Sequence, residues 1–233
     1  MVTEIIPRYE DPGYSLRRYY IDRFLLATVG QQKGSGLLLD LGGNKVQKRG
    51  LFDYSCCDMN VIYANITADK QPDVQADAAA LPFADNCFDI VVCAELLEHV
   101  YTPENVLAEV FRVLKIGGQL LITVPFLVQI HADPADYGRY TDAYWERCLV
   151  ETGFGGIEIE RQGDFRSVTV DMITAYVQHK AQAGRLNPVV HHFFKWCLAR
   201  GRKNALQPEG RIENTLSAFC RSFTTGFGIS CRK

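Results

Sequence analysis

The chain has 233 residues, 47% of them hydrophobic and 22% charged, and its 25 Lys and Arg against 27 Asp and Glu give a formal net charge of −2. This composition is that of a globular protein, and it excludes collagen-like, mucin-like and wholly disordered chains. The near-neutral charge gives no reason to expect a nucleic-acid partner.

Membrane and disulfide signals are weak. The most apolar stretch, residues 120–130, is too short to span a bilayer, and the opening residues MVTEIIPRYED contain no hydrophobic signal segment. The 8 cysteines are scattered without a CxxC pair, and most lie in apolar runs, as reduced cysteines do. The adjacent Cys56 and Cys57 leave a redox or metal role open. We expect a reduced, cytoplasmic protein without a metal site.

Strands and helices alternate through the first half of the chain. Residues 17–29 have the apolar spacing of a helix, and the apolar run 37–39 between glycines is typical of a central parallel strand. Further strands are expected at 59–66, 74–76, 88–93 and 119–124. These elements predict a parallel α/β sheet.

The last two of those strands flank a helix with defined ends. Thr102 is its expected N-cap, Pro103 its first residue and Glu104 a favourable charge in its first turn. Its apolar stripe runs to Leu114, and Gly117 with Gly118 is expected to end it. A strand, helix and strand of these lengths form a right-handed crossover.

The second half of the chain is expected to complete the sheet. It contains a helix at 143–151, a strand at 156–161 and a last strand at 224–231, which we expect to pair antiparallel at the sheet edge. We therefore predict one Rossmann-like α/β domain over 1–233, with seven mostly parallel strands and helices on both faces. Its expected parts are an N-terminal helical cover (1–30), a core (31–162), a helical insertion (163–222) and the last strand (223–233).

A ligand site is expected after the first strand. Asp40 is followed by Gly42 and Gly43, and glycines in such a turn let the backbone approach a ligand closely. Asn65 ends the second strand, where a nucleoside ribose is usually held. In open α/β sheets, ligands bind beyond the carboxyl ends of the strands at the topological switch point.

A longer ordered pattern follows. Residues 77–100 read DAAALPFADNCFDIVVCAELLEHV, and the chain continues through Glu109 and RVLK (112–115) to the glycine pair 117–118 and Pro125. Residues 77–125 resemble the class I S-adenosylmethionine-dependent methyltransferases of the type 11-like group nearly throughout. The resemblance implies S-adenosylmethionine as cofactor.

The resemblance also implies roles for individual residues. Asp40 would face the amino group of the methionine moiety, Asn65 the ribose hydroxyls and Asp77 the adenine amino group. The full set of implied cofactor-binding residues is Asp40, Gly42, Gly43, Asn65, Asp77, Ala78, Ala94 and Glu95.

Two positions depart from the family pattern. Asn44 replaces the second glycine of the Gly-x-Gly turn, and Asn65 replaces an acidic residue. An amide gives up the charge-assisted hydrogen bonds that a carboxylate makes to ribose. These departures keep open a catalytically silent relative that acts as a binding or regulatory partner. A nicotinamide-dependent oxidoreductase is a further alternative, against which Asp40 and the 77–125 pattern argue.

The acceptor site is expected in the loop 125–141. This loop resembles the PF…HxxPxDYxRYT loop of methyltransferases associated with cell-surface polysaccharides, which favours an O or N acceptor on a small molecule or saccharide. His131 is the candidate base because its ordinary pKa is near neutrality, and Asp136 is the second catalytic candidate. The candidate substrate-binding residues are Asp133, Tyr137, Arg139 and Tyr140. A plain turn in which the arginine pairs with an aspartate is the competing interpretation. His99 is read as structural.

Residues 180–203 mix basic and aromatic side chains and contain no acidic residue. Such a helix is compatible with peripheral membrane contact, with an anionic substrate, or with simple packing against the domain. The oligomeric state is left open.

Overall fold

Seven strands form one mixed sheet in the computed structural model, which describes residues 14–32, 34–46, 50–207 and 215–233. The strand order is β3-β2-β1-β4-β5-β7-β6. In chain order the strands are β1 (Leu37–Leu41), β2 (Asn60–Asn65), β3 (Val74–Gln75), β4 (Phe88–Ala94), β5 (Leu114–Pro125), β6 (Gly155–Gln162) and β7 (Gly226–Arg232). The first five are mutually parallel, whereas β7 runs antiparallel to both β5 and β6. The predicted fold class is confirmed.

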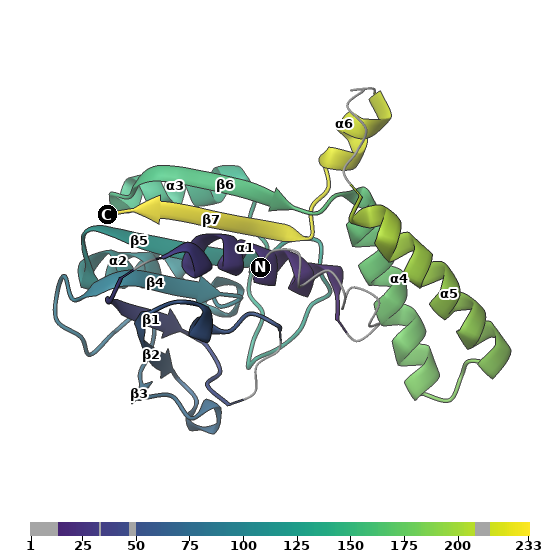
Figure 1. Ribbon diagram of the computed structural model, residues 1–233, viewed down its shortest axis with the longest axis horizontal. Coiled ribbons are helices and arrows are strands. Elements are labelled where there is room, and N and C mark those ends of the chain that lie inside the picture. The colour runs from purple at the N-terminus through teal and green to yellow at the C-terminus, as the bar shows by residue number, and fades with distance from the viewer. Residues whose placement is uncertain (1–13, 33, 47–49, 208–214) are drawn as a thin grey trace.

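Helices cover both faces of this sheet (Figure 1). The helices are α1 (Leu16–Thr28), α2 (Pro103–Val113), α3 (Asp142–Thr152), α4 (Phe165–Gln182), α5 (Pro188–Ala205) and α6 (Thr215–Arg221). On one face, apolar residues of α2 and α3 such as Leu107 and Trp145 join the core; on the other, Phe24 of α1 packs with Leu38 and Val92. The helices bury the apolar faces of the strands, which accounts for the strongly hydrophobic runs in the central strands.

The parallel order reverses at β1, whose neighbours are β2 on one side and β4 on the other. The loops after β1 and β4 therefore separate, and they leave room for a ligand at the carboxyl ends of these strands. The pair α4–α5 extends outward from this end of the sheet (Figure 1), since α4 begins directly after β6. No helix in the described ranges is long and apolar enough to cross a membrane.

Three expectations about local structure need correction. The last strand is not at the sheet edge: β7 lies between β5 and β6, and its backbone pairs with both of these strands. The helix α2 ends at Val113 rather than near Gly117, because Leu114 already pairs with Phe88 as the start of β5.

Thr102 does occupy the N-cap position of α2, but its hydroxyl makes no capping hydrogen bond and instead accepts one from the side chain of Asn105. The amino-terminal stretch from which we judged the absence of a signal segment lies outside the described residues, so that judgement stays a prediction.

Candidate functional site

A cleft of about 510 Å³ opens at the carboxyl ends of β1, β2 and β4. All eight residues predicted to bind the cofactor line it, and so do four residues of the acceptor loop, His131, Asp133, Pro134 and Tyr137. Asp136, Arg139 and Tyr140 are not among the residues that line this cleft. The fold therefore brings most of the residues of the predicted site together around one cleft, and three predicted residues of the acceptor loop lie outside its lining.

The turn after β1 requires glycine at two positions. Gly42 has φ +82°, and a Cβ there would lie 2.8 Å from a methyl carbon of Leu96. A Cβ on Gly43 would meet the carboxylate of Asp40. The Asp40 carboxylate therefore packs directly against the backbone at Gly43, in space that a side chain at position 43 would fill. Asn44 has no such requirement, because the described non-glycine residues with positive φ are Gln71, Asn86 and Glu95.

Asn65 fixes that turn from β2. Its Nδ2 donates to the carbonyl oxygens of Gly42 (2.9 Å) and Gly43 (3.0 Å), and its Oδ1 accepts from the backbone N–H and the hydroxyl of Thr67. The side chain is 8% exposed. The amide therefore has a structural task that a carboxylate could not perform, because a carboxylate has no proton to donate.

Asp77 and Tyr54 mark two further sides of the cleft. Asp77 is exposed, and its Oδ1 accepts a hydrogen bond from the backbone N–H of Ala79, which orients the carboxylate at the rim. Tyr54 packs near Asp40, and burial together with the Asp40 carboxylate raises the pKa of the Tyr54 phenol well above its usual value. The tyrosine therefore stays a neutral wall of the cleft.

Glu95 sits at the end of β4 in the left-handed region, with φ 52°. Its carboxylate pairs with Arg17 of α1 at 2.5 Å, and Arg17 also donates to Gln162. Although burial acts to raise it, the Arg17 guanidinium lowers the pKa of Glu95. A non-glycine residue in this backbone region is uncommon and costs free energy, so its neighbours must hold it in place.

The acceptor loop is ordered by Asp136. This carboxylate binds Arg139 through both oxygens and accepts a hydrogen bond from the backbone N–H of His131 at 2.9 Å. Arg139 lowers the pKa of Asp136 to about 2. Asp136 is thus a poor proton acceptor near neutrality, and this geometry contains the arginine–aspartate turn expected as the competing interpretation.

The two tyrosines of the loop lie in different surroundings. Tyr137 is 54% exposed and meets Tyr101 edge-on at the mouth of the cleft, whereas Tyr140 stacks on Tyr144 with ring centroids 4.1 Å apart. Asp133 reaches across the cleft to Lys70, with 3.8 Å between Oδ2 and Nζ. Tyr137 and Asp133 are therefore the loop residues best placed to meet a ligand, beside His131.

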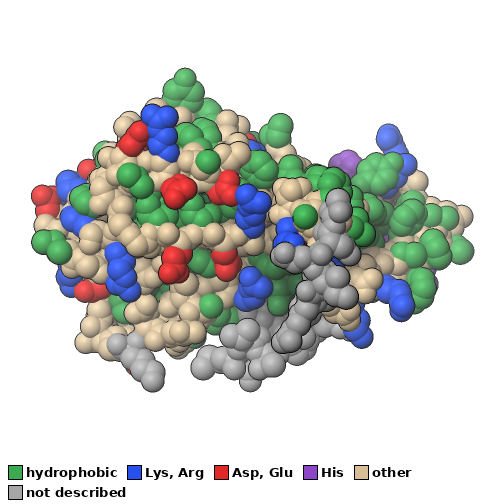
Figure 2. Space-filling model, turned by 90° about the horizontal axis from the view of Figure 1, so that it is seen from above, with side chains coloured by type: hydrophobic (Ala, Val, Ile, Leu, Met, Phe, Trp, Pro, Cys, Tyr) green, Lys and Arg blue, Asp and Glu red, His purple; other side chains and the backbone are tan. Residues whose placement is uncertain are grey.

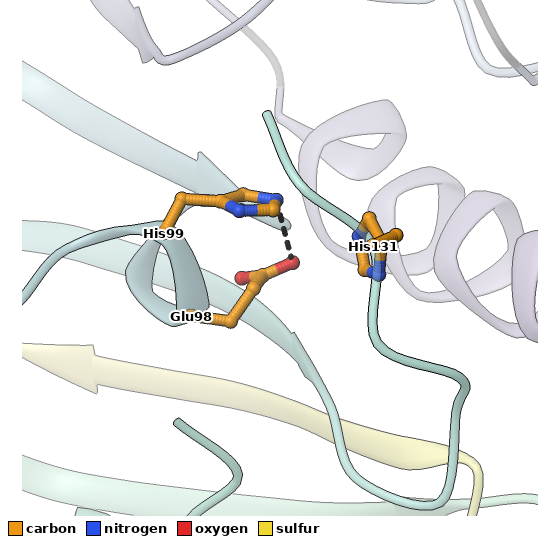
Figure 3. Close-up of side chains that lie close together, drawn as sticks. All are labelled: Glu98, His99 and His131. Carbon is orange, nitrogen blue, oxygen red and sulfur yellow. Dashed lines mark ion pairs between the residues drawn. The ribbon is translucent and has the colours of Figure 1, made fainter. Parts of the chain in front are cut away.

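Sequence reasoning assigned no role in the site to Glu98 or Arg17 and read His99 as structural. Figure 3 shows Glu98 and His99, from the short 3-10 turn Leu97–His99 after β4, facing His131 of the loop after β5. Glu98 is 1% exposed, and in the part of the chain that the structure describes neither of its carboxylate oxygens has a hydrogen-bond partner. Burial, with nearby Glu95, raises the pKa of Glu98. The LLEHV stretch was the available signal, but it was used only as a family pattern.

Comparison with known proteins finds a domain match and relatives that are covered in part. Residues 39–122 match the family model described as a methyltransferase domain. The ubiquinone/menaquinone biosynthesis C-methyltransferase of Erwinia tasmaniensis is 41% identical over 85 residues, which are 36% of this chain and 28% of that protein. The demethylmenaquinone methyltransferase of Renibacterium salmoninarum is 38% identical over 135 residues, 52% of this chain and 56% of that protein. The chain spans about half, or less, of the curated relatives it matches.

Solved structures share the fold at low sequence identity. One is a phosphoethanolamine N-methyltransferase 2 of Haemonchus contortus in complex with phosphomonomethylethanolamine and S-adenosylhomocysteine, with 18% identity, TM-score 0.53, and coverage of 90% of this chain and 51% of that chain. A possible histamine N-methyltransferase of Thermotoga maritima is 15% identical, with a TM-score of 0.54, and the match covers 100% of this chain and 96% of that chain. Residues 39–122 thus match a methyltransferase domain, and the strand order of the whole sheet occurs in a fold that these solved structures share.

Proposed function

We propose that the protein binds S-adenosylmethionine in this cleft and transfers its methyl group to an O or N atom of a small molecule or saccharide. The single observation that carries the proposal is the convergence of all eight predicted cofactor residues on one cleft, from the ends of the four adjacent strands β3, β2, β1 and β4. When bound, the cofactor supplies a methyl group on a positively charged sulfur.

The residues present fit such a ligand. The cradle of Asp40 against Gly43 leaves a carboxylate beside backbone that has no side chain, which suits an ammonium group. Asp77 offers a carboxylate at the rim for an adenine amino group, and Ala78 offers a backbone N–H next to it. Asn65 would influence ribose binding indirectly, because it holds the turn at Gly42 and Gly43 in place. A direct hydrogen bond between Asn65 and the ribose stays a prediction.

Within the proposal, the chain's residues orient the acceptor and remove its proton. Methyl transfer is an in-line displacement, so alignment of the acceptor contributes much of the rate. His131 lines the cleft, and as a neutral imidazole it would accept a proton from the acceptor. Asp136 would position His131 by holding its backbone N–H, and Asp133 with Tyr137 would contact the acceptor.

The comparisons leave the acceptor atom open, since one relative is named a ubiquinone/menaquinone biosynthesis C-methyltransferase and another a demethylmenaquinone methyltransferase. A carbon acceptor is the second candidate function for this reason. A carbon nucleophile also needs a proton removed, so the role proposed for His131 is the same.

We also propose that the projecting α4–α5 end makes peripheral contact with an anionic membrane surface. Figure 2 shows hydrophobic and basic side chains next to one another on this end. Val189, Phe193 and Trp196 follow helical spacing on α5 and are 60–78% exposed, and Lys195 and Lys203 are exposed as well. Arg202 also belongs to the basic segment 180–203 of the sequence. It is only 1% exposed, however, and donates a hydrogen bond to the carbonyl oxygen of Tyr14.

Calorimetric titration with S-adenosylhomocysteine tests the proposed function. We expect saturable binding that Asp77→Asn weakens by about tenfold or more, because a charge-assisted hydrogen bond is lost. Asp58→Asn, at an exposed position outside the cleft, is the matched control and should bind as the parent protein does. Absence of binding by a folded protein, or equal binding by Asp77→Asn, would contradict the proposal.

A further inference from the structure

We infer that Glu98, His99 and His131 form a site for a divalent transition-metal ion that holds the hydroxyl group of the methyl acceptor. The cation site stands on its own observations, whereas its role in holding an acceptor rests on the proposed function. One ligand atom from each of the three residues lies within 4.8 Å of the other two. Two imidazoles and a carboxylate are a donor set that first-row transition metals favour and that leaves positions for other ligands.

Glu98 provides the first independent observation. Its carboxylate is 1% exposed, neither oxygen accepts a hydrogen bond from the described residues, and Oε1 lies 3.6 Å from Nε2 of His99. A buried carboxylate without hydrogen bonds is costly, and a cation would compensate it. Ligand atoms around a tetrahedral zinc ion are about 3.4 Å apart, so this Oε1–Nε2 separation already suits one.

The two histidines provide the second observation. Nδ1 of His99 lies 2.5 Å from the carbonyl oxygen of Ala135, and Nδ1 of His131 lies 3.2 Å from that of Gln129. A carbonyl oxygen can only accept, so each Nδ1 is the donor, and in the neutral ring with that proton Nε2 offers a lone pair to a cation. Metal-binding histidines nearly always donate their other ring N–H in this way.

The segments that carry the ligands are tied together. The backbone N–H of Tyr137 donates to the carbonyl of Glu98 at 2.8 Å, so the acceptor loop is attached to the 3-10 turn beside both histidines. The rings of His99 and His131 are edge-on with centroids 5.0 Å apart, and both side chains line the cleft (Figure 3). The cation would therefore sit where the cleft meets the acceptor loop.

This position specifies the acceptor class. A hydroxyl oxygen bound to the cation would be more acidic, so its O–H bond would break more readily and its proton would pass to water. The oxygen lone pair then forms a C–O bond with the methyl carbon, the C–S bond breaks, and its electron pair remains on sulfur. With the cation bound, His131 would be a ligand, and water would take the proton that the proposal without a cation assigns to His131.

Metal titration of chelator-treated protein tests the inference. Calorimetry with Zn²⁺ and with Mn²⁺ is expected to give one site per chain, and His131→Asn and Glu98→Gln are each expected to weaken it by about tenfold or more. His131→Asn lies on a loop with a side chain 32% exposed, so it should fold even if Glu98→Gln does not. His191→Asn on α5 is the matched control and should leave binding unchanged.

Two results would overturn the inference: no binding of either metal by the folded parent protein, or binding that His131→Asn leaves unchanged, which would identify adventitious surface ligands. A parallel titration with S-adenosylhomocysteine in the presence of EDTA separates this failure from failure of the proposed function. We expect it to give normal cofactor-site binding, because none of the three proposed ligands belongs to the predicted cofactor set.

Discussion

The guanidinium of Arg17 and the carboxylate of Glu95 join α1 to the carboxyl end of β4, with Nη2 and Oε1 2.5 Å apart. The same α1 start is held from the other side, because Asp171 of α4 accepts the backbone N–H groups of Leu16 and Arg17. The N-terminal helix is thus more than a cover: it links the projecting α4–α5 pair to a residue that lines the cleft.

Substitution of Arg17 tests this linkage. Arg17→Met leaves the largely buried Glu95 carboxylate without its cation, so we expect the free energy of unfolding to fall by about 3–5 kcal/mol. Urea denaturation measures the change. The double variant Arg17→Met/Glu95→Gln should lose less than the sum of the single variants, because the stranded charge is gone.

Arg23→Met is the control for Arg17→Met, since Arg23 contacts Glu160 at 3.6 Å on the surface and should contribute less than about 1 kcal/mol. Strict additivity of the Arg17 and Glu95 substitutions would contradict the linkage.

Asn65→Asp distinguishes two interpretations of the departure from the family pattern. If Asn65 merely replaces a ribose-binding acid, the aspartate should tighten cofactor binding. Because its Nδ2 donates to Gly42 and Gly43, we instead expect Asn65→Asp to lower the free energy of unfolding by about 1–3 kcal/mol and to weaken S-adenosylhomocysteine binding. Asn60→Asp, at the exposed start of β2, is the control, and tighter binding by Asn65→Asp would refute this account.

Acid stability depends on the pair Glu109 and Arg112. Arg112 holds the pKa of Glu109 below its ordinary value of 4.5, and the backbone N–H of Leu81 assists. A carboxylate with a depressed pKa stabilises the folded state above its unfolded pKa, and this contribution is lost as the pH falls through the folded value.

Arg112→Met should therefore cost about 1–3 kcal/mol at pH 7 and less at pH 3, as measured by urea midpoints at both pH values. The hydrogen bonds from Arg112 to the carbonyl oxygens of Leu81 and Phe83 are lost at either pH. Arg147→Met removes an exposed i,i+4 pair with Glu151 and should change little at either pH. An equal loss for Arg112→Met at both pH values would contradict the assigned cause.

Vesicle binding tests the α5 surface. We expect the protein to sediment with phosphatidylglycerol vesicles more than with phosphatidylcholine vesicles, because exposed Phe193 and Trp196 lie among basic side chains. Phe193→Ser/Trp196→Ser should reduce this binding several-fold. Ile116→Ser, which alters an isoleucine that is 88% exposed near Gly117, is the control. Equal sedimentation with both lipids would contradict an anionic-surface contact.

Local periodicity and turn chemistry predicted most of the fold because the central strands and α2 carry patterns that depend on near neighbours in the chain. The position of β7 could not be predicted in this way, since it depends on pairing between β7 and β6, which are far apart in sequence. The same limit hid Arg17, whose partners Glu95 and Gln162 are distant in the chain. Glu98 was present in a recognised pattern, but its lack of hydrogen bonds is a property of three-dimensional packing alone.

The crystal structure of the protein with bound S-adenosylhomocysteine tests the central claim most directly. The account predicts the adenine amino group within hydrogen-bond distance of Asp77, the ammonium group at Asp40, and the sulfur at the end of the cleft formed by Glu95, His99 and His131. A ligand bound elsewhere, or bound in the cleft with its adenine at the His131 end, would contradict the proposed site and the direction of methyl transfer.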